Sequence, residues 1–321
     1  MNKLIKDAAH IPVPKAQQAI SISPITLPMS DRDQPLELRV TAPAVGKNLP
    51  IILLSHGHGP SLYLPSKDGY GPLVNFLAER GFVVIQPTHA NSRVAGLDPK
   101  SADAPLFWRQ RIAELTAILD GFTAIEAQAP ILAGRLDREN IGAIGHSMGG
   151  QTVGMLLGAR FSDLSNPDLQ DVTLTDPRIK VGVLMAGPGN GGAGLSEFAS
   201  RFGFFNAEFS QMKTKTLVIV GDADTSEHLT TRGAEWHCDP YHHGPGADAL
   251  LTLKGGKHGM GGIAGYDAKE TDDEDPDRLE ITLRMTWAYL QSAMITGDRA
   301  WADACAALKE HAALKGDIAT K

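Results

Sequence analysis

The hydrophobic and polar positions of this chain alternate in two patterns, one typical of strands and one typical of helices. Residues 20–23 and 36–40 alternate apolar with polar side chains, which predicts two half-exposed strands paired as an antiparallel edge. Other short runs are predominantly apolar, as strands buried on both faces of a parallel sheet are. These runs cover residues 50–55, 82–85, 140–145, 181–185, 216–220 and 249–253.

Segments with helical periodicity separate these strands, at residues 70–80, 106–122, 148–160, 278–293 and 299–314. Repeated strand-helix units predict an α/β protein with a doubly wound, mostly parallel sheet. Residues 1–18 lack periodicity and contain Pro12 and Pro14, so we expect them to form an arm on the surface. We expect residues 19–321 to form one domain, because an α/β chain of 321 residues can bury a single large core.

Composition and charge exclude several classes of protein. A hydrophobic content of 42% and a charged content of 21% are those of an ordinary globular protein. The net charge of −7 argues against nucleic acid or an anionic membrane as a partner. No stretch approaches the roughly 20 apolar residues of a membrane span. Cys238 and Cys305 lie too far apart for a metal or redox motif. We therefore expect a soluble, cytoplasmic protein with a small, uncharged or weakly charged ligand.

One apolar run ends in a sequence that carries chemistry. Residues 141–150 read Ile-Gly-Ala-Ile-Gly-His-Ser-Met-Gly-Gly, which predicts a strand, a sharp turn and a helix, with Ser147 held at the turn between glycines. The helix would direct its N-terminal amides at the serine oxygen, where negative charge would develop. Ser147 is therefore the predicted nucleophile, and the backbone N–H of Met148 the first oxyanion donor.

Three other strand ends carry groups that such a serine needs. His58 lies in the Gly-rich residues 55–60, and its backbone N–H is the predicted second oxyanion donor. Asp224 follows the strand at 216–220, and His258 follows the strand at 249–253 on a Gly-flanked loop. A serine needs an imidazole to accept its proton, and the imidazole needs a carboxylate to fix its tautomer. Ser147, Asp224 and His258 fill these catalytic roles, with Asp222 as the alternative acid.

These four motifs resemble those of the α/β-hydrolase superfamily, within the serine members of the dienelactone hydrolase and platelet-activating-factor acetylhydrolase-like group. They lie at residues 54–59, 145–150, 221–224 and 256–259. The resemblance implies hydrolysis of a small-molecule carboxylic ester without a cofactor, and it favours Asp224 over Asp222. Dienelactone hydrolases proper carry a cysteine nucleophile where this chain has Ser147, so their particular substrate is not implied.

A Gly-rich and Phe-rich segment lies between two predicted strands, at about residues 187–213, and contains half of the ten phenylalanines. We predict a short cap over the nucleophile, with Phe204 and Phe205 lining an acyl pocket for chains of roughly four to eight carbons. The alternative is that these rings complete the core beneath a surface helix.

Two clusters could be taken for metal sites. Residues 236–243 contain three histidines and a cysteine, and residues 267–277 contain seven acids. We favour a loop over the pocket for the first and a solvated, helix-capping loop for the second, because a serine hydrolase needs no metal. No metal is predicted.

The sequence thus predicts a carboxylesterase that works through an acyl-enzyme. A lipase, thioesterase or lactonase would use the same residues. A noncatalytic ligand-binding protein with this fold is the alternative of a different class.

Overall fold

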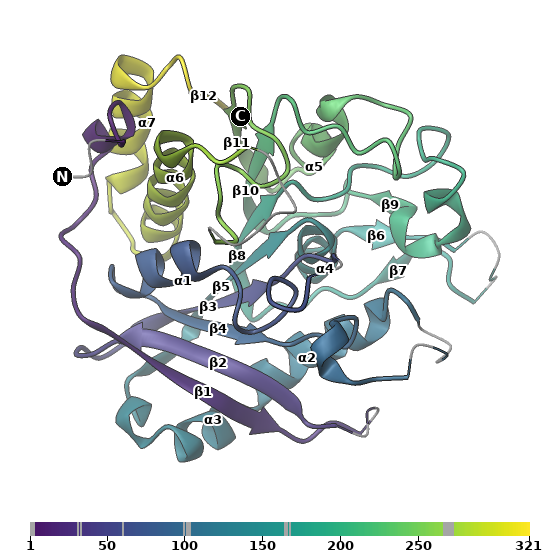
Figure 1. Ribbon diagram of the computed structural model, residues 1–321, viewed down its shortest axis with the longest axis horizontal. Coiled ribbons are helices and arrows are strands. Elements are labelled where there is room, and N and C mark those ends of the chain that lie inside the picture. Colours follow the sequence, from purple (N-terminus) through teal and green to yellow (C-terminus); the bar gives the residue numbers. More distant parts are fainter. Residues whose placement is uncertain are drawn as a thin grey trace.

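A nine-stranded sheet forms the centre of the computed structural model, which describes residues 4–30, 32, 34–59, 61–98, 100, 104–163, 166, 168–265 and 273–321. Its strands lie in the order β1-β2-β4-β3-β5-β8-β10-β11-β12 (Figure 1). Their bounds are β1 Ala19–Leu27, β2 Leu36–Pro43, β3 Leu49–Ser55, β4 Val83–Pro87, β5 Leu136–His146, β8 Ile179–Met185, β10 Lys215–Gly221, β11 Ala247–Leu253 and β12 Gly316–Thr320.

The sheet is mixed but mostly parallel. The six strands from β4 to β11 pair in parallel, whereas β1 with β2, β2 with β4, and β11 with β12 pair antiparallel. The predicted α/β class, the mostly parallel sheet and the antiparallel edge at 20–23 and 36–40 are confirmed. The apolar runs became the inner strands because both of their faces are covered.

Helices pack on both faces of this sheet (Figure 1). One face is covered by α1 (Gly71–Ala78), α6 (Pro276–Met294) and α7 (Ala300–His311), and their apolar residues share one core with the sheet. The other face is covered by α2 (Trp108–Asp120), α3 (Phe122–Gln128), α4 (Met148–Leu156) and the short α5 (Asp239–His243), which share a second core. The arrangement is a three-layer α/β/α sandwich.

Three elements differ from the predictions. The helix predicted at 106–122 is two helices, because Gly121 ends α2 and begins α3. The last helix ends at His311, and the chain then returns as β12, a strand that was not predicted. In the edge strand β12, the buried residues Gly316 and Ile318 alternate with exposed ones. This pattern covers only five residues, too few to predict the strand from the sequence.

A second, three-stranded sheet was not predicted either. It consists of β6 (Arg160–Phe161), β7 (Val172–Thr173) and β9 (Ala207–Glu208), in the order β7-β6-β9. Strands of two residues carry too few positions to show a period in the sequence. The segment 187–213 contributes β9 and the 3₁₀ turns η4 (Ala199–Arg201) and η5 (Gly203–Phe205).

The N-terminal residues pack against the C-terminal helices. The turn η1 (Ala8–His10) lies beside α6 and α7, where Asp277 accepts hydrogen bonds from the backbone N–H groups of Lys6 and Ala8. Ala8 and Ile11 are fully buried in the core beneath these helices. The arm predicted for residues 1–18 is therefore fixed by core contacts at Ala8 and Ile11, whereas residues 14–18 are exposed on the surface as predicted.

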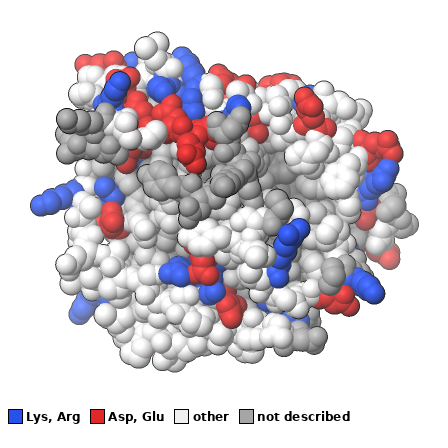
Figure 2. Space-filling view, viewed as in Figure 1, with Lys and Arg blue, Asp and Glu red and all other residues white. Residues whose placement is uncertain are grey.

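The surface carries charges of both signs. On the face shown in Figure 2, acidic and basic side chains are interspersed, and the described residues form no continuous basic patch there. No helix within the described ranges is long and apolar enough to cross a membrane.

Candidate active site

Ser147 stands between β5 and α4 in a backbone conformation that few residues adopt. Its φ of 56° and ψ of −124° lie outside the favoured regions for a residue with a side chain. Its N–H donates to the Met185 carbonyl of the neighbouring strand at 2.8 Å, and its own carbonyl accepts from Gly150 N–H at 2.8 Å. The strand and the helix thus hold the predicted nucleophile at the carboxyl edge of the sheet, in a strained turn.

The glycines around Ser147 are required by the close packing of backbone atoms. A Cβ on Gly145 would lie 2.0 Å from the Gly149 carbonyl oxygen, and a Cβ on Gly149 would lie 2.0 Å from the Ser55 carbonyl oxygen. Neither contact is possible without moving the backbone. Helix α4 can therefore approach both β5 and the loop after β3 only because these positions are glycine.

His258 is joined to Asp224 by a hydrogen bond. The distance from Nδ1 of His258 to Oδ2 of Asp224 is 2.9 Å, and Asp224 is buried at 3% exposure. Burial alone would raise the pKa of this carboxyl, but the hydrogen bond and charge of His258, together with smaller contributions from His237 and His146, outweigh burial and hold the pKa below its usual value. Because an ionised carboxylate only accepts, Nδ1 carries the hydrogen, and Nε2 of His258 is left as a base.

The structure distinguishes the two candidate acids. Asp222 accepts a hydrogen bond from the Gly255 N–H at 2.6 Å and is exposed, whereas Asp224 contacts His258. A second imidazole, His237, lies 3.5 Å from the same Asp224 oxygen, and its Nδ1 donates to the Gly187 carbonyl at 2.7 Å. His237 therefore shields Asp224 from solvent, a contact that the sequence did not predict.

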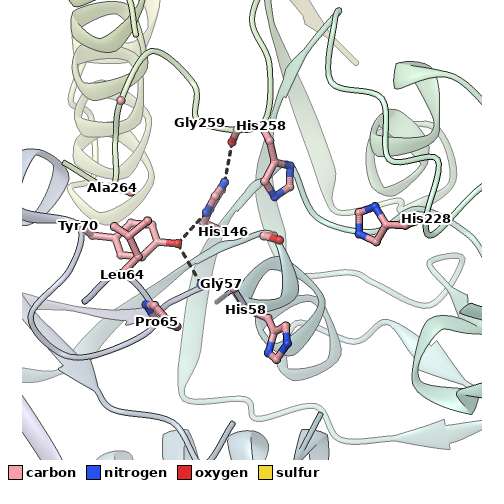
Figure 3. A pocket seen from close by; sticks show the side chains of 13 residues that line it. Gly57, His58, Leu64, Pro65, Tyr70, His146, His228, His258, Gly259 and Ala264 are labelled. Carbon is pink, nitrogen blue, oxygen red and sulfur yellow. Dashed lines mark hydrogen bonds between the residues drawn. The ribbon is translucent and has the colours of Figure 1, made fainter. Parts of the chain in front are cut away.

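Ser147 and His258 line one cavity of about 240 Å³, shown in Figure 3. His58, His146 and His228 also line it, together with the apolar side chains of Leu64, Pro65 and Ala264. No hydrogen bond joins the Ser147 hydroxyl to His258 in this structure, where both residues are described. Such contacts in free enzymes often shorten only when substrate binds.

The two predicted oxyanion donors lie beside this serine. Met148 is the first residue of α4, and His58 lies in the loop after β3, which borders the cavity. Within the described chain, no acceptor is recorded for the backbone N–H of either residue. Two amides without acceptors, one at a helix N-terminus, are what a developing oxyanion requires.

Tyr70 and His146 connect the loop after β3 to the His258 loop, as Figure 3 shows. Nε2 of His146 lies 2.8 Å from the His258 carbonyl oxygen, which only accepts, so this nitrogen carries a hydrogen. Burial lowers the pKa of His146 to about 3, so the ring is neutral and its Nδ1 accepts from the Tyr70 hydroxyl at 2.7 Å. The Tyr70 oxygen in turn accepts from the Gly57 N–H at 3.0 Å.

On the prediction that this chain is an esterase, Tyr70→Phe should slow ester hydrolysis. The change leaves Gly57 N–H and His146 Nδ1 without their partner, which should cost about 1–3 kcal/mol of stability and loosen the loop that carries the His58 amide. We expect kcat for a 4-nitrophenyl acetate substrate to fall about tenfold, with KM changed less, since the oxyanion amide acts in the transition state. Tyr63→Phe is the matched control, because Tyr63 is 49% exposed. Lower thermal stability with an unchanged kcat would mean that Tyr70 only supports the fold.

A second serine-histidine-carboxylate array lies beneath the loop after β3. Nε2 of His89 is 2.9 Å from the Ser55 hydroxyl, and Nδ1 of His89 is 2.7 Å from Glu114. All three residues are fully buried, so no substrate can reach Ser55. Arg111 donates to both the Ser55 hydroxyl and the His56 carbonyl, and Arg32 donates to Glu114 at 2.6 Å. This array supports the loop that carries His58.

The predicted acyl-pocket residues lie elsewhere. Phe204 and Phe205 are 1% and 5% exposed and belong to the core on the α4 face of the sheet. Their rings pack against each other with centroids 5.4 Å apart, and Phe204 also stacks on Trp108. Neither residue lines the cavity beside Ser147. The expectation of an aromatic acyl wall is thus not met, because these rings are used to cover the sheet.

In the histidine-rich cluster at 236–243 and the acidic cluster at 267–277, the described side chains make hydrogen bonds and ion pairs within the protein. His237 is bonded as above, and Asp239 pairs with Arg232 at 2.6 Å. Residues 267–272 of the acidic run lie outside the described residues, while Asp275 caps α6 by accepting from the N–H groups of Asp277 and Arg278. Across the described ranges, no group of three or more His, Cys, Asp or Glu side chains is arranged to hold a metal.

The supporting residues Tyr70, His89, Glu114 and His237 were missed by sequence reasoning. Only His89 could have been found from the sequence, because it follows the predicted strand at 82–85 and so lies near the edge of the sheet that carries the site. The chain matches no protein-family model, and no curated protein is detectably similar to it in sequence. Any function must therefore be argued from the site itself.

Proposed function

We propose that this chain is a serine hydrolase that cleaves carboxylic esters of short acyl chains through an acyl-enzyme. Ser147 is the nucleophile, His258 the general base and Asp224 the acid that orients it. The backbone N–H groups of His58 and Met148 form the oxyanion hole. No cofactor is required for this chemistry.

One observation carries the proposal. A serine in a strained strand-to-helix turn shares a cavity with a histidine whose Nδ1–H is bonded to a buried carboxylate. Residues held in rare backbone conformations are concentrated at functional sites, and this histidine tautomer is the one that can accept a proton from serine. The buried Ser55-His89-Glu114 array has similar contacts but no access to solvent.

The reaction proceeds in two halves. Ser147 Oγ attacks the ester carbonyl carbon while its proton passes to Nε2 of His258, and the carbonyl oxygen becomes an oxyanion held by the two amides. The carbon–oxygen bond to the alcohol then breaks, and His258 gives the proton to the departing alcohol. Water repeats the steps on the acyl-enzyme, using His258 as the base, and the carboxylic acid leaves.

The fold is consistent with this assignment. Ligands of open α/β sheets bind beyond the carboxyl ends of the strands, and Ser147, Asp224 and His258 follow β5, β10 and β11 at that edge. We therefore propose that the chain belongs to the α/β-hydrolase superfamily, close to the serine members of the dienelactone hydrolase and platelet-activating-factor acetylhydrolase-like group. This membership rests on the site and on four short motifs.

The size of the cavity limits the acyl group. Its volume of about 240 Å³ lies below the range of pockets that hold drug-sized ligands. Leu64, Pro65 and Ala264 give it an apolar wall. We propose acetyl to butyryl esters as the preferred substrates. These acyl chains are shorter than the chains expected for an aromatic acyl pocket.

Labelling with a fluorophosphonate tests the proposal. An activated serine reacts rapidly and once per chain, so mass spectrometry should find one adduct, on the peptide that contains Ser147. Heat-denatured protein is the control and should not react. A noncatalytic binding protein would remain unlabelled. An adduct on the Ser55 peptide would show that Ser55 is the reactive serine and would overturn the assignment of Ser147.

A further inference from the structure

A second cavity of about 440 Å³ adjoins the first and shares His58 and Gly59 with it. Its other lining residues come from two segments, Ala90, Asn91, Ser92, Arg93 and Leu97 after β4, and Pro105 and Phe107 before α2. If the small apolar cavity takes the acyl chain, the second cavity is left for the alcohol part of the ester. We propose that it is a subsite for an anionic group on that alcohol part, an inference that rests on the proposed esterase function.

Ser92 is the first observation in favour. It is only 4% exposed, yet its hydroxyl has no hydrogen-bond partner among the described residues. An unpaired buried hydroxyl costs free energy unless a ligand or water satisfies it. Ser92 lines the second cavity, so a turn of its side chain would bring the hydroxyl to a bound oxygen atom there and supply the missing partner.

The His58 ring supplies a donor at the boundary between the two cavities. Arg111 donates to the Asn91 side-chain oxygen, so the Asn91 nitrogen is the group that donates to Nδ1 of His58 at 2.8 Å. Nδ1 therefore accepts, and the hydrogen of the neutral ring is on Nε2. Burial, Arg111 and Arg93 all lower the pKa of His58, so the ring stays neutral at pH 7.

Arg93 supplies the positive charge. No ion pair to Arg93 is recorded within the described residues, and its field is felt by His58. Among those residues, no Asp or Glu lines either cavity, although the chain as a whole has a net charge of −7. A cavity whose described lining holds no acid and includes His58, Ser92 and Arg93 as donors complements a carboxylate or another oxyanion rather than a cation.

Two isosteric esters test this inference, 3-carboxyphenyl acetate and 3-carbamoylphenyl acetate, which differ in the charge of the alcohol part. We expect wild-type kcat/KM to be about tenfold higher for the carboxylate, the effect of one partly exposed charged hydrogen bond. Arg93→Gln should remove this preference and leave the amide ester unchanged, and Ser92→Ala should reduce it. Arg299→Gln is the matched control, because Arg299 lies outside both cavities.

Salt and direct binding separate the possible failures. Raising the salt concentration from about 0.05 to about 0.5 M should weaken the preference of the wild type, since a partly exposed charge is screened. Calorimetry measures the binding of 3-hydroxybenzoate to the subsite independently of catalysis. This binding should be lost in Arg93→Gln. Equal turnover of the two esters, or an equal loss on both in Arg93→Gln, would overturn the subsite while the esterase function stands. Binding without hydrolysis would overturn the esterase function and keep the subsite.

Discussion

Ser147→Ala should abolish ester hydrolysis, with kcat for 4-nitrophenyl acetate falling on the order of a millionfold, as when a catalytic triad loses its nucleophile. The reason is that, among the described residues, the other serines bonded to a histidine, Ser55 and Ser226, have buried histidine partners, whereas Ser147 shares a cavity with His258. The buried Ser55 cannot substitute, because His89 and Glu114 around it are closed to solvent. Steady-state kinetics with active-site titration measures the change.

The fold should be unaffected by this substitution. The Ser147 backbone bonds to Met185 and Gly150 do not involve the side chain, so we expect the melting temperature to change by only a few degrees. Ser200→Ala is the control, since Ser200 is exposed at a distance from the cavity. Activity of Ser147→Ala within tenfold of the wild type would overturn the assignment of the nucleophile and the proposed function with it.

Asp224→Asn should lower kcat by about 10⁴ while the protein remains folded. An asparagine amide would donate to Nδ1 of His258 and move the ring hydrogen to Nε2, and that tautomer cannot accept the proton of Ser147. The carboxylate at Asp224 is ionised despite its burial, because His258 donates to it. Pre-steady-state kinetics should find the loss in the acylation step.

Asp222→Asn is the matched control, two residues away on the same loop. Its oxygen accepts from the Gly255 N–H, and an asparagine oxygen can still do so, so kcat should change less than about threefold. A larger loss in Asp222→Asn than in Asp224→Asn would mean that Asp222 orients the histidine when substrate is bound.

Local patterns in the sequence were sufficient for every strand of the nine-stranded sheet except β12, and they named the residues of the candidate site. Fully apolar runs such as 51–54 have no exposed face, and only a strand covered by helices on both sides satisfies them. Glycines at 145 and 149 around Ser147 indicated a turn in which backbone atoms come too close for a Cβ. The carboxyl ends of parallel strands meet at one edge, so groups at 58, 147, 224 and 258 could be brought together by pattern alone.

Elements without a local signal could not be predicted. The two-residue strands β6, β7 and β9 are too short for a period, and β12 forms because the edge of β11 offers unpaired backbone groups. The sequence around Phe204 and Phe205 would look the same whether the rings formed a cap or part of the core. Only the tertiary packing decides that they are buried, in the core on the α4 face of the nine-stranded sheet.

By itself the sequence determined the α/β class, the turn that holds Ser147 and the set of residues in the candidate site, because each is encoded within a few consecutive residues. The tertiary structure decided which carboxylate reaches His258, since Asp222 and Asp224 are equivalent until the strand end turns one toward the ring. It also decided the contacts of Tyr70, His146 and Arg111 and the second cavity beside His58. These depend on residues 20 to 112 positions apart in the chain, which only folding brings within hydrogen-bond distance.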